Sequence, residues 1–188
     1  MPYLPEEIIK EILRRLPVKT LLRFRSVSKP WRSLIDSKQF IKLHLHHSFR
    51  SNSNRTLLVD SSQLYHVDLD SFKQLEIGDT RIEPHSVVGS CDGLVLLVPK
   101  SDDIALWNPS IRKLHKLPEQ FPLPDCFLDF EYVQCIFALG YDTKSDDYKV
   151  VRVIQASSGG GCGHFSTEAT IYSLRSNTWK RAADFPYL

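Results

Sequence analysis

Apolar residues near the start of the chain recur with a helical period. Between Ile8 and Leu16 they fall every three or four positions and form one broad apolar stripe, with charged residues between them. Pro5 suits a first helical turn, where its missing N–H has no partner to lose. Pro17 is expected to end the helix, because its ring clashes with the preceding turn. The pattern predicts a helix between the two prolines.

The same region predicts two more short helices. Residues 18–24 fit one helix of about two turns. Ser28 suits the N-cap of the next, with Pro30 early in it and the apolar residues of 31–35 on one face. Apolar residues at 40, 41 and 43 continue a helical trace after Ser37. The start of the chain is therefore expected to be a small helical domain.

These helices carry more apolar residues than they can bury against one another, since a unit of about 45 residues is near the lower limit for an independent core. The surplus positions are Leu4, Ile8, Ile12, Leu21, Leu22, Val27 and Trp31. Helices often use such stripes to bind a groove on a partner protein. We therefore expect this surface to face a partner.

The order Leu-Pro-x-Glu-x-Ile-x-x-Ile-Leu-x-x-Leu-Pro-Val-Lys-x-Leu-Leu-Arg-Phe-Arg-x-Val-x-Lys-x-Trp-Arg-x-Leu-Ile, from Leu4 to Ile35, resembles the F-box, especially that of the large plant family. Ser28 stands where these proteins often have Cys, a change between small residues. The resemblance implies a three-helix F-box over residues 1–47. It also implies binding to a Skp-type adaptor, which bridges to the cullin and RING subunits of an SCF ubiquitin ligase.

Transferred position by position, the resemblance gives thirteen residues that would bind the adaptor. They are Leu4, Pro5, Ile8, Ile9, Ile12, Leu13, Leu16, Pro17, Leu21, Leu22, Arg25, Val27 and Trp31. For Ile9, Leu13 and Leu34, packing in the helical core is an equal alternative. For Leu4, Pro5 and Leu21 the interface is the favoured interpretation.

The rest of the chain follows a different pattern. Residues 48–55 are small and polar and are expected to be a linker. Beyond them, residues 64–75, 106–117 and 171–182 align without gaps, each with an aliphatic–aromatic pair, a polar turn and a large apolar residue. This repeat predicts three hairpins. Their spacing fits propeller blades of roughly 40–50 residues, with insertions before the third.

The segments SCDGLVLL, IALWNPSIRKLHKLP, ALGYDTKSDDYKVVRV and ATIYSLRSNTWKRA are similar to the F-box-associated, kelch-like domain behind plant F-boxes. The resemblance implies an α+β protein whose residues 56–188 form an all-β, kelch-like partial β-propeller that captures the protein to be ubiquitinated. About three blades fit this length, whereas a closed propeller needs roughly 4–8. We therefore expect the β domain to be incomplete.

The balance of charge also changes near residue 55, where the helical pattern gives way to the predicted strands. Residues 1–55 hold 12 Lys and Arg against 4 Asp and Glu, and residues 56–188 hold 12 against 18. The basic helices leave a helix-turn-helix DNA binder as an alternative. Against it, the cations are scattered over three helices, and phosphate would repel the acidic second half. The scattered residues are Arg14, Arg15, Lys19, Arg23, Lys29 and Arg32.

The sequence lacks motifs of catalysis or nucleotide binding, so no enzyme, cofactor or metal is expected. His44, His46 and His47 are interpreted as a solvated helix end, and Asp142, Asp146 and Asp147 as a solvated acidic turn. The glycine-rich segment 157–163 lacks the Lys-Ser/Thr of a phosphate loop and is interpreted as a flexible loop.

Two features bear on location. The longest apolar run, residues 94–98, is too short to span a membrane, and the chain starts without a signal-peptide pattern. The four cysteines, at 91, 126, 135 and 162, have no CxxC spacing, which favours free thiols in a reducing compartment. Cysteine 91 is expected to be a small buried strand residue. The expected location is the cytoplasm, the nucleus or both.

Together these patterns predict a non-catalytic substrate-recognition subunit of an SCF-type ubiquitin ligase. Its F-box would bind the Skp-type adaptor, and its β domain would bind a protein substrate whose contact residues are unknown. Two alternatives remain open: an adaptor-binding protein that cannot deliver a substrate, and the DNA binder.

Overall fold

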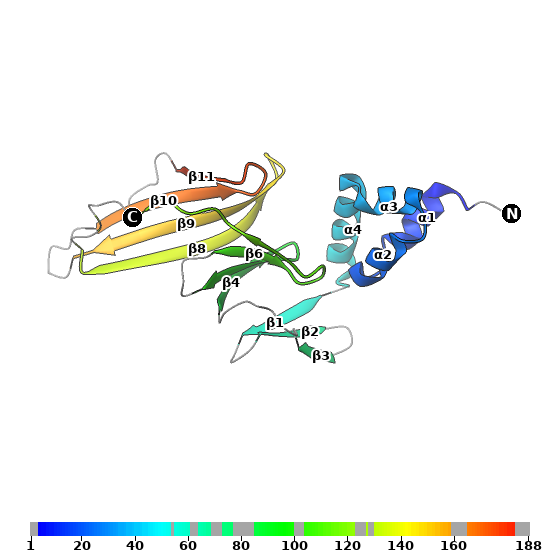
Figure 1. Ribbon diagram of the computed structural model, residues 1–188, viewed down its shortest axis with the longest axis horizontal. Coiled ribbons are helices and arrows are strands. Elements are labelled where there is room, and N and C mark those ends of the chain that lie inside the picture. Colours follow the sequence, from blue (N-terminus) through cyan, green and yellow to red (C-terminus); the bar gives the residue numbers. More distant parts are fainter. Residues whose placement is uncertain are drawn as a thin grey trace. The chain divides into compact units, whose positions relative to one another are not determined.

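The structure, a computed structural model, describes residues 4–53, 55–60, 64–68, 73–76, 85–99, 104–122, 127, 130–158 and 165–182. The chain divides into two units, Met1–Pro84 and His85–Leu188 (Figure 1). The first unit contains the helices and a small sheet, and the second contains two larger sheets. This order of helices followed by antiparallel sheets confirms the α+β class and the partial propeller.

Four helices open the first unit: α1 (Glu6–Leu13), α2 (Val18–Phe24), α3 (Lys29–Asp36) and α4 (Lys38–Ser51). The prediction for α2 is confirmed at both ends. Ser28 caps α3 as predicted, because its side-chain oxygen accepts a hydrogen bond of 3.3 Å from the Trp31 N–H.

Two predicted helix boundaries differ from the structure. Helix α1 ends at Leu13 rather than at Pro17, and a tight turn connects it to α2. The cause lies in Pro17, since a proline has no N–H to donate and its ring clashes with the carbonyl four residues earlier, that of Leu13. The linker expected at 48–55 also begins later, because α4 continues to Ser51 and ends at Asn52 in the left-handed conformation.

The helical core is small. Leu13, Leu21, Ile35 and Phe40 are buried, one from each helix. Half-buried apolar residues surround them, and the Phe24 and Trp31 rings meet edge to face at 5.6 Å. Each fully buried side chain contributes about 2 kcal/mol by leaving water. Four such residues hold together four short helices, which leaves little reserve of stability.

A three-stranded antiparallel sheet completes the first unit: β1 (Thr56–Asp60), β2 (Leu64–Asp68) and β3 (Lys73–Glu76). The first predicted hairpin is therefore confirmed as β2–β3. Its register is not that of the other two hairpins, since Tyr65 pairs with Glu76. The predicted apolar partner at position 72 lies outside the described residues.

The second unit has two four-stranded antiparallel sheets (Figure 1). The first contains β4 (His85–Cys91), β5 (Leu94–Pro99), β6 (Ala105–Asn108) and β7 (Lys113–Lys116), in that order. The second contains β8 (Tyr132–Asp142), β9 (Asp147–Ser157), β10 (Phe165–Ser173) and β11 (Thr178–Arg181), also in chain order. Each sheet is thus a simple meander, which is the form of a propeller blade.

The second and third predicted hairpins are the last two strands of these sheets. Trp107 pairs with Leu114 in β6–β7, and Tyr172 pairs with Trp179 in β10–β11. Even the turns match, because Arg112 and Asn177 have positive φ of 52° and 54° at equivalent positions. The gapless repeat therefore corresponds to equivalent hairpins, β6–β7 and β10–β11, in the two sheets.

The core of the second unit lies between the two sheets. Its buried residues come from both: Leu96, Ile104 and Leu106 from one side, and Val150, Tyr172 and Trp179 from the other. Cys91, predicted to be buried, is half-buried at the end of β4. Burial is the main cause that raises its thiol pKa, and the Asp92 carboxylate adds to it.

Candidate functional site

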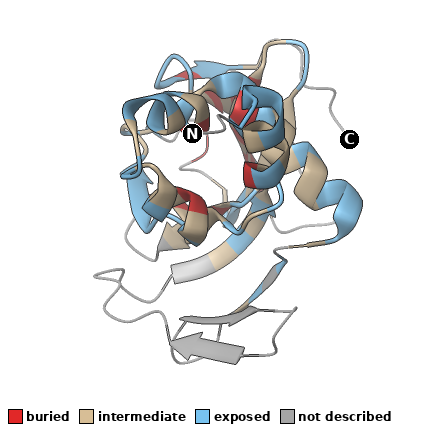
Figure 2. Ribbon diagram, turned by 90° about the vertical axis from the view of Figure 1, so that its right-hand side faces the viewer, coloured by how far each residue is buried: buried red, intermediate tan, exposed pale blue. Residues whose placement is uncertain are grey.

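Helix α1 exposes a line of apolar side chains. Ile8 and Ile12 are spaced by four residues and are 48% and 49% exposed, and Leu4, which precedes the helix, is 50% exposed. Four residues advance slightly more than one helical turn, so Ile8 and Ile12 lie along one face. Figure 2 shows the few buried helical positions in red among exposed positions in pale blue. We call Leu4, Ile8 and Ile12, together with exposed Pro5, the α1 stripe.

An ion cluster lies beside the α1 stripe. The Glu11 carboxylate pairs with the Arg14 guanidinium at 2.5 Å and with that of Arg15 at 2.5 Å. Hydrogen bonds from Arg14, then from Arg15, lower the pKa of Glu11 from 4.5 to about 2. The Glu11 carboxylate offsets one of the two arginine charges, so the cluster beside the stripe keeps a net positive charge.

The structure separates the thirteen predicted adaptor-binding residues into three groups. Leu4, Pro5, Ile8, Ile12, Pro17 and Val27 are exposed. Five are half-buried: Ile9, Leu16, Leu22, Arg25 and Trp31. Leu13 and Leu21 are buried in the helical core. For Leu21 the sequence favoured the interface, but its position among the helices makes it a packing residue in this structure.

Arg25 has a structural role that its sequence position did not reveal. Its guanidinium faces the Asp36 carboxylate at two points, Nε to Oδ1 at 2.8 Å and Nη2 to Oδ2 at 2.8 Å. This two-point contact joins the end of α2 to the end of α3. Arg32, one turn before Asp36, lies 3.8 Å from the same carboxylate.

A second exposed apolar line lies on α4. Ile41 and Phe49 are 53% and 73% exposed, with half-buried Leu45 between them. The spacing by four residues was a signal that the sequence already contained. We call Ile41, Leu45 and Phe49 the α4 stripe. The sequence predicted the helical trace after Ser37 but not this exposed line.

The histidines on α4 are not all solvated, contrary to the expectation. His44 is half-buried, and its Nε2 donates to the Leu16 carbonyl at 2.9 Å. That carbonyl lies in the turn between α1 and α2, where helical hydrogen bonding is interrupted. His47 is also half-buried, and only His46 is exposed. His44 therefore joins α4 to the start of the domain.

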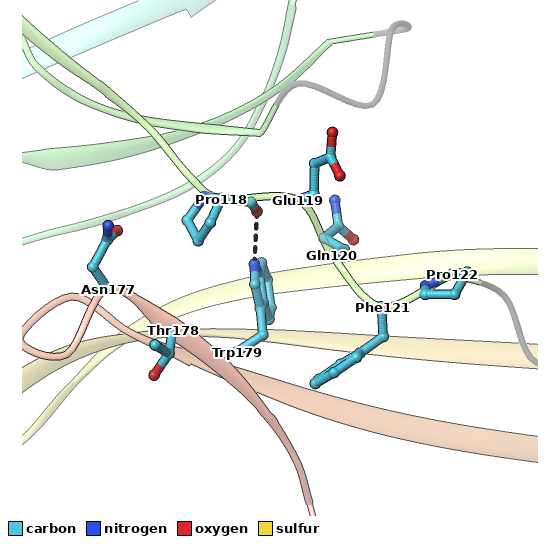
Figure 3. A pocket seen from close by; sticks show the side chains of 8 residues that line it. All are labelled: Pro118, Glu119, Gln120, Phe121, Pro122, Asn177, Thr178 and Trp179. Atoms are coloured by element: carbon cyan, nitrogen blue, oxygen red, sulfur yellow. Dashed lines mark hydrogen bonds between the residues drawn. The ribbon is translucent and has the colours of Figure 1, made fainter.

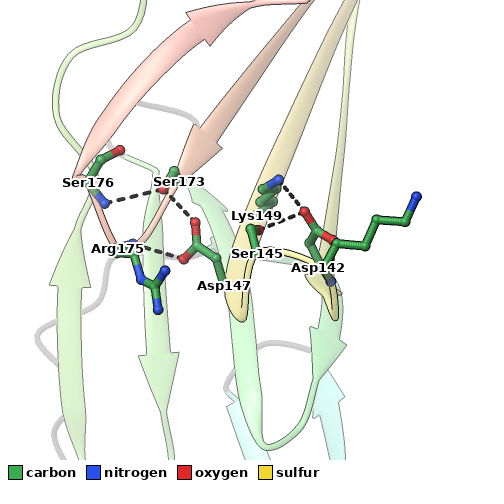
Figure 4. A network of polar contacts seen from close by, with 8 residues as sticks. Asp142, Ser145, Asp147, Lys149, Ser173, Arg175 and Ser176 are labelled. Carbon is green, nitrogen blue, oxygen red and sulfur yellow. Dashed lines mark hydrogen bonds and ion pairs between the residues drawn. The ribbon is translucent and has the colours of Figure 1, made fainter.

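The acidic turn of the second unit is also more structured than expected (Figure 4). Asp147 is buried, and it accepts hydrogen bonds from the Ser173 hydroxyl at 2.5 Å and the Arg175 N–H at 2.9 Å. Asp142 accepts from Lys149 at 2.5 Å, and this contact is the main cause that lowers its pKa. The prediction of a solvated turn is wrong for Asp147, because its side chain is buried against the β10–β11 hairpin.

Polar contacts connect the two sheets of the second unit. The Tyr148 hydroxyl donates to Asp92 at 3.1 Å, and the Tyr172 hydroxyl donates to Asn177 at 2.8 Å and lies 3.0 Å from His115 Nε2. Burial raises the pKa of both tyrosines, and Asp92 raises that of Tyr148 further. These contacts fix the packing of the sheets and leave both tyrosines neutral at physiological pH.

An open pocket of about 280 Å³ lies between residues 118–122 and the start of β11 (Figure 3). The Trp179 indole forms its floor and donates to the Pro118 carbonyl at 3.0 Å. Buried Arg152 donates to the Phe121 carbonyl at 2.9 Å, while Arg181 lies 5.4 Å above the Phe121 ring. These contacts hold the loop on the edge strand β11.

Other chemistry is limited in the part of the chain that the structure describes. These residues contain no cluster of three or more His, Cys, Asp or Glu able to hold a metal ion. Cys91 and Cys135 are free thiols, and the remaining two cysteines lie outside the described residues. None of the described helices is long and apolar enough to cross a membrane.

The helical domain with its exposed stripe, followed by meander sheets, defines the class of F-box proteins. Residues 1–43 match the F-box domain, and residues 36–187 match the F-box associated beta propeller domain. The chain therefore belongs to the family of plant F-box proteins with an F-box associated beta-propeller domain. The two matches overlap in residues 36–43, so helix α4 begins where the domains meet.

Three relatives of this chain are proteins of Arabidopsis thaliana. F-box protein CPR1 is 40% identical over 96% of this chain and 45% of its own length. An F-box/kelch-repeat protein is 33% identical over 97% of this chain and 52% of its own length, and Putative F-box only protein 15 is 31% identical over 94% and 46%. The chain spans about half the length of these relatives. No solved structure matches it.

Proposed function

We propose that this chain is a substrate-recognition subunit of an SCF-type ubiquitin ligase, with its F-box bound to a Skp-type adaptor and its β domain bound to a protein substrate. The adaptor would connect it to the cullin and RING subunits. The chain would act without catalysis, by holding the substrate near a recruited ubiquitin-conjugating enzyme. The observation that carries the proposal is the α1 stripe, which is exposed and lies within the segment that matches the F-box domain.

The physical case for docking is that the helical unit leaves large apolar side chains exposed to water. Leu4, Ile8 and Ile12 would each gain about 1 kcal/mol or more from covering their exposed halves. The neighbouring Glu11 offsets one of the two arginine charges, so a partner would meet an apolar surface beside a net positive charge. This is the arrangement of a helix that binds in a groove.

DNA binding has less support. Three of the six cations that it would use are in ion pairs: Arg14 and Arg15 with Glu11, and Arg32 with Asp36. A phosphate would have to compete with these carboxylates. A salt-dependent DNA mobility shift at submicromolar protein would favour this alternative, and we expect none.

Co-purification with a Skp-type adaptor tests docking. Wild type is expected to retain the adaptor, and Leu4→Ala/Pro5→Ala is expected to lose most of it, because both residues lie at the exposed start of the α1 stripe. Leu114→Ala, an exposed position on β7, is the matched control and should bind like wild type. Equal binding by the double variant would show that the interface assignment is wrong.

Delivery of a protein substrate to the ligase needs a separate experiment, which measures ubiquitination. In a reconstituted ligase, a captured target should be ubiquitinated in the presence of this chain. Adaptor binding without transfer would instead support a protein that occupies the adaptor but cannot deliver a substrate.

We also propose a location in the cytoplasm, the nucleus or both, which a fluorescent fusion would test; a fusion confined to the secretory pathway would contradict it.

A further inference from the structure

The hairpins of the second unit turn at one end of its two sheets. Each turn connects two described strands, and the contacts of Tyr148 with Asp92 and of His115 with Tyr172 bring the hairpins of one sheet beside those of the other. The turns are residues 92–93 (β4–β5), 109–112 (β6–β7), 143–146 (β8–β9) and 174–177 (β10–β11). We call these four turns the turn end.

Three of these turns have the same backbone geometry. A polar side chain precedes each one, since Asn108, Asp142 and Ser173 accept a hydrogen bond from a backbone N–H two or three residues later. The fourth residue after each of these has a positive φ of 52°, 53° or 54°: Arg112, Asp146 and Asn177. Corresponding positions in these turns therefore have corresponding places on the surface.

Two cations occupy corresponding positions. Lys144 and Arg175 each lie two residues after the preceding polar side chain, and both are exposed. Their backbone N–H groups donate to Asp142 at 3.0 Å and to Asp147 at 2.9 Å, but their charged groups form no ion pair among the residues that the structure describes. In Figure 4 the Asp147 carboxylate binds the backbone of Arg175, and no dashed line reaches the guanidinium.

A third cation, Arg112, lies in the β6–β7 turn. It is exposed, as is Lys113 after it, and its guanidinium also lacks an ion pair within the described part of the chain. Few residues other than glycine adopt a positive φ, and asparagine is among those enriched there, as Asn177 shows at the corresponding position. An arginine is less favourable in this conformation, so formation of the turn does not explain its presence.

The carboxylates in these turns, and those on the strand residues next to them, are used within the unit. Each accepts a hydrogen bond from a neighbouring side chain: Asp92 from Tyr148, Asp142 from Lys149, Asp146 from Tyr141 and Asp147 from Ser173. The charges that the turn end presents to solvent are therefore mainly positive. This local charge stands against the composition of residues 85–188, which contain 10 Lys and Arg and 12 Asp and Glu.

We propose that the turn end binds an acidic segment of the protein substrate, with Arg112, Lys144 and Arg175 pairing with its Asp or Glu side chains. The proposal rests on the proposed function, in which the β domain binds the substrate, and it supplies contact residues. Charge complementarity selects the occupant, because the carboxylates of the turn end already have partners whereas its exposed cations are unpaired among the described residues. Recognition residues commonly lie on turns that a rigid scaffold positions.

Nucleic acid is the other common polyanion, but the charge of the second unit disfavours it. A nucleic acid long enough to extend past the turn end would meet a unit with more carboxylates than cations. A short acidic segment would contact the cations of the turn end alone. Peptide and nucleic acid can be compared directly in one binding experiment.

Fluorescence anisotropy with the full chain and a labelled deca-glutamate peptide tests the proposal at low salt. Wild type is expected to bind this probe, and Lys144→Glu/Arg175→Glu should weaken binding by about tenfold, because two attractions become repulsions. The matched control is Lys19→Glu/Arg23→Glu, which makes the same change in net charge at two exposed positions of α2. It should bind within about twofold of wild type. Added salt should weaken wild-type binding.

Arg112→Asn keeps the test valid if a double variant fails to fold. Asparagine already occupies the corresponding position 177, so this variant should preserve the turn while it removes one charge. Probe binding should weaken by about threefold. Circular dichroism verifies that each variant is folded, and co-purification with a Skp-type adaptor is measured on the same preparations.

Four outcomes would overturn the proposal. They are no binding of deca-glutamate by wild type, unchanged binding by folded turn-end variants, loss of binding in the α2 control instead, and tighter binding of a deca-uridylate RNA than of the peptide. The last outcome would indicate a nucleic-acid surface. Failure of wild type to bind the adaptor would contradict the proposed function, whereas peptide binding that depends on the turn end would still support this site.

Discussion

The helical unit and the two-sheet unit use their apolar residues in opposite ways. Helix α1 leaves Leu4, Ile8 and Ile12 half exposed, whereas the sheets bury residues such as Leu96 and Tyr172 completely. Their polar contacts differ as well. The Arg25–Asp36 ion pair joins α2 to α3 at the surface, while tyrosine hydroxyls connect one sheet to the other. The helical unit therefore has a small core beside an exposed apolar stripe, whereas the two sheets share a larger buried core.

The largest effect should follow from emptying the sheet core. Tyr172→Ala removes a fully buried ring and two hydroxyl contacts, so it should lower the free energy of unfolding by about 4 kcal/mol. Urea unfolding followed by the fluorescence of Trp107 and Trp179 measures this loss. Tyr172→Phe, which keeps the ring, should cost only about 1 kcal/mol. Equal losses from the two variants would show that the ring itself contributes little.

Adjacent positions on α1 should then behave very differently. Leu13→Ala removes the most buried residue of the helical core and should cost about 3 kcal/mol. Ile12→Ala, next to it but half exposed, should cost about 1 kcal/mol or less. Circular dichroism at 222 nm during thermal unfolding compares the two. A similar loss at both positions would contradict the division between core and stripe.

A smaller effect is expected at the buried carboxylate of the second unit. Asp147→Ala leaves the Arg175 N–H and the Ser173 hydroxyl without their acceptor, which should cost about 2 kcal/mol. Asp147→Asn retains one acceptor oxygen and should lose roughly half as much. The free energy of unfolding in urea, measured for wild type and both variants, tests these expected losses. An alanine variant as stable as wild type would restore the interpretation of this turn as solvated.

The smallest effect concerns the ion cluster beside the α1 stripe. Because the folded pKa of Glu11 is about 2 and its ordinary value is 4.5, its contribution to stability is present above pH 4.5 and is lost as the pH falls toward 2. The group is exposed, so salt should screen the effect. NMR titration should place the Glu11 pKa near 2 in wild type. A value near 4.5 would show that the cluster does not form in solution.

The sequence predicted most of this organisation, and its failures have physical causes. Helical period located the first three helices, and the cap at Ser28 fixed the start of α3. Two of three hairpins were found with the correct pairs, because Trp107–Leu114 and Tyr172–Trp179 have the same turn geometry. The register of β2–β3 was not predicted correctly, because the repeat constrains residue types but not the position of the turn.

Burial within the candidate site was harder to predict than its location. Periodicity shows which residues share a face, but it does not show which face another helix covers. Leu21 and Ile12 are both apolar and helical, yet only Leu21 is enclosed by the other helices. Likewise, the positions of Arg25 beside Asp36 and of Asp147 beside Ser173 depend on contacts between elements distant in the sequence.

The most direct test of the contrast between the two units is the affinity of the α1 stripe for a Skp-type adaptor. Calorimetry would compare wild type with Ile8→Gln/Ile12→Gln, in which polar side chains of similar helix propensity replace two exposed residues. We predict that the Kd rises by about 100-fold or more while helicity is unchanged, since two apolar anchors are lost. An unchanged Kd in a folded double variant would contradict the account.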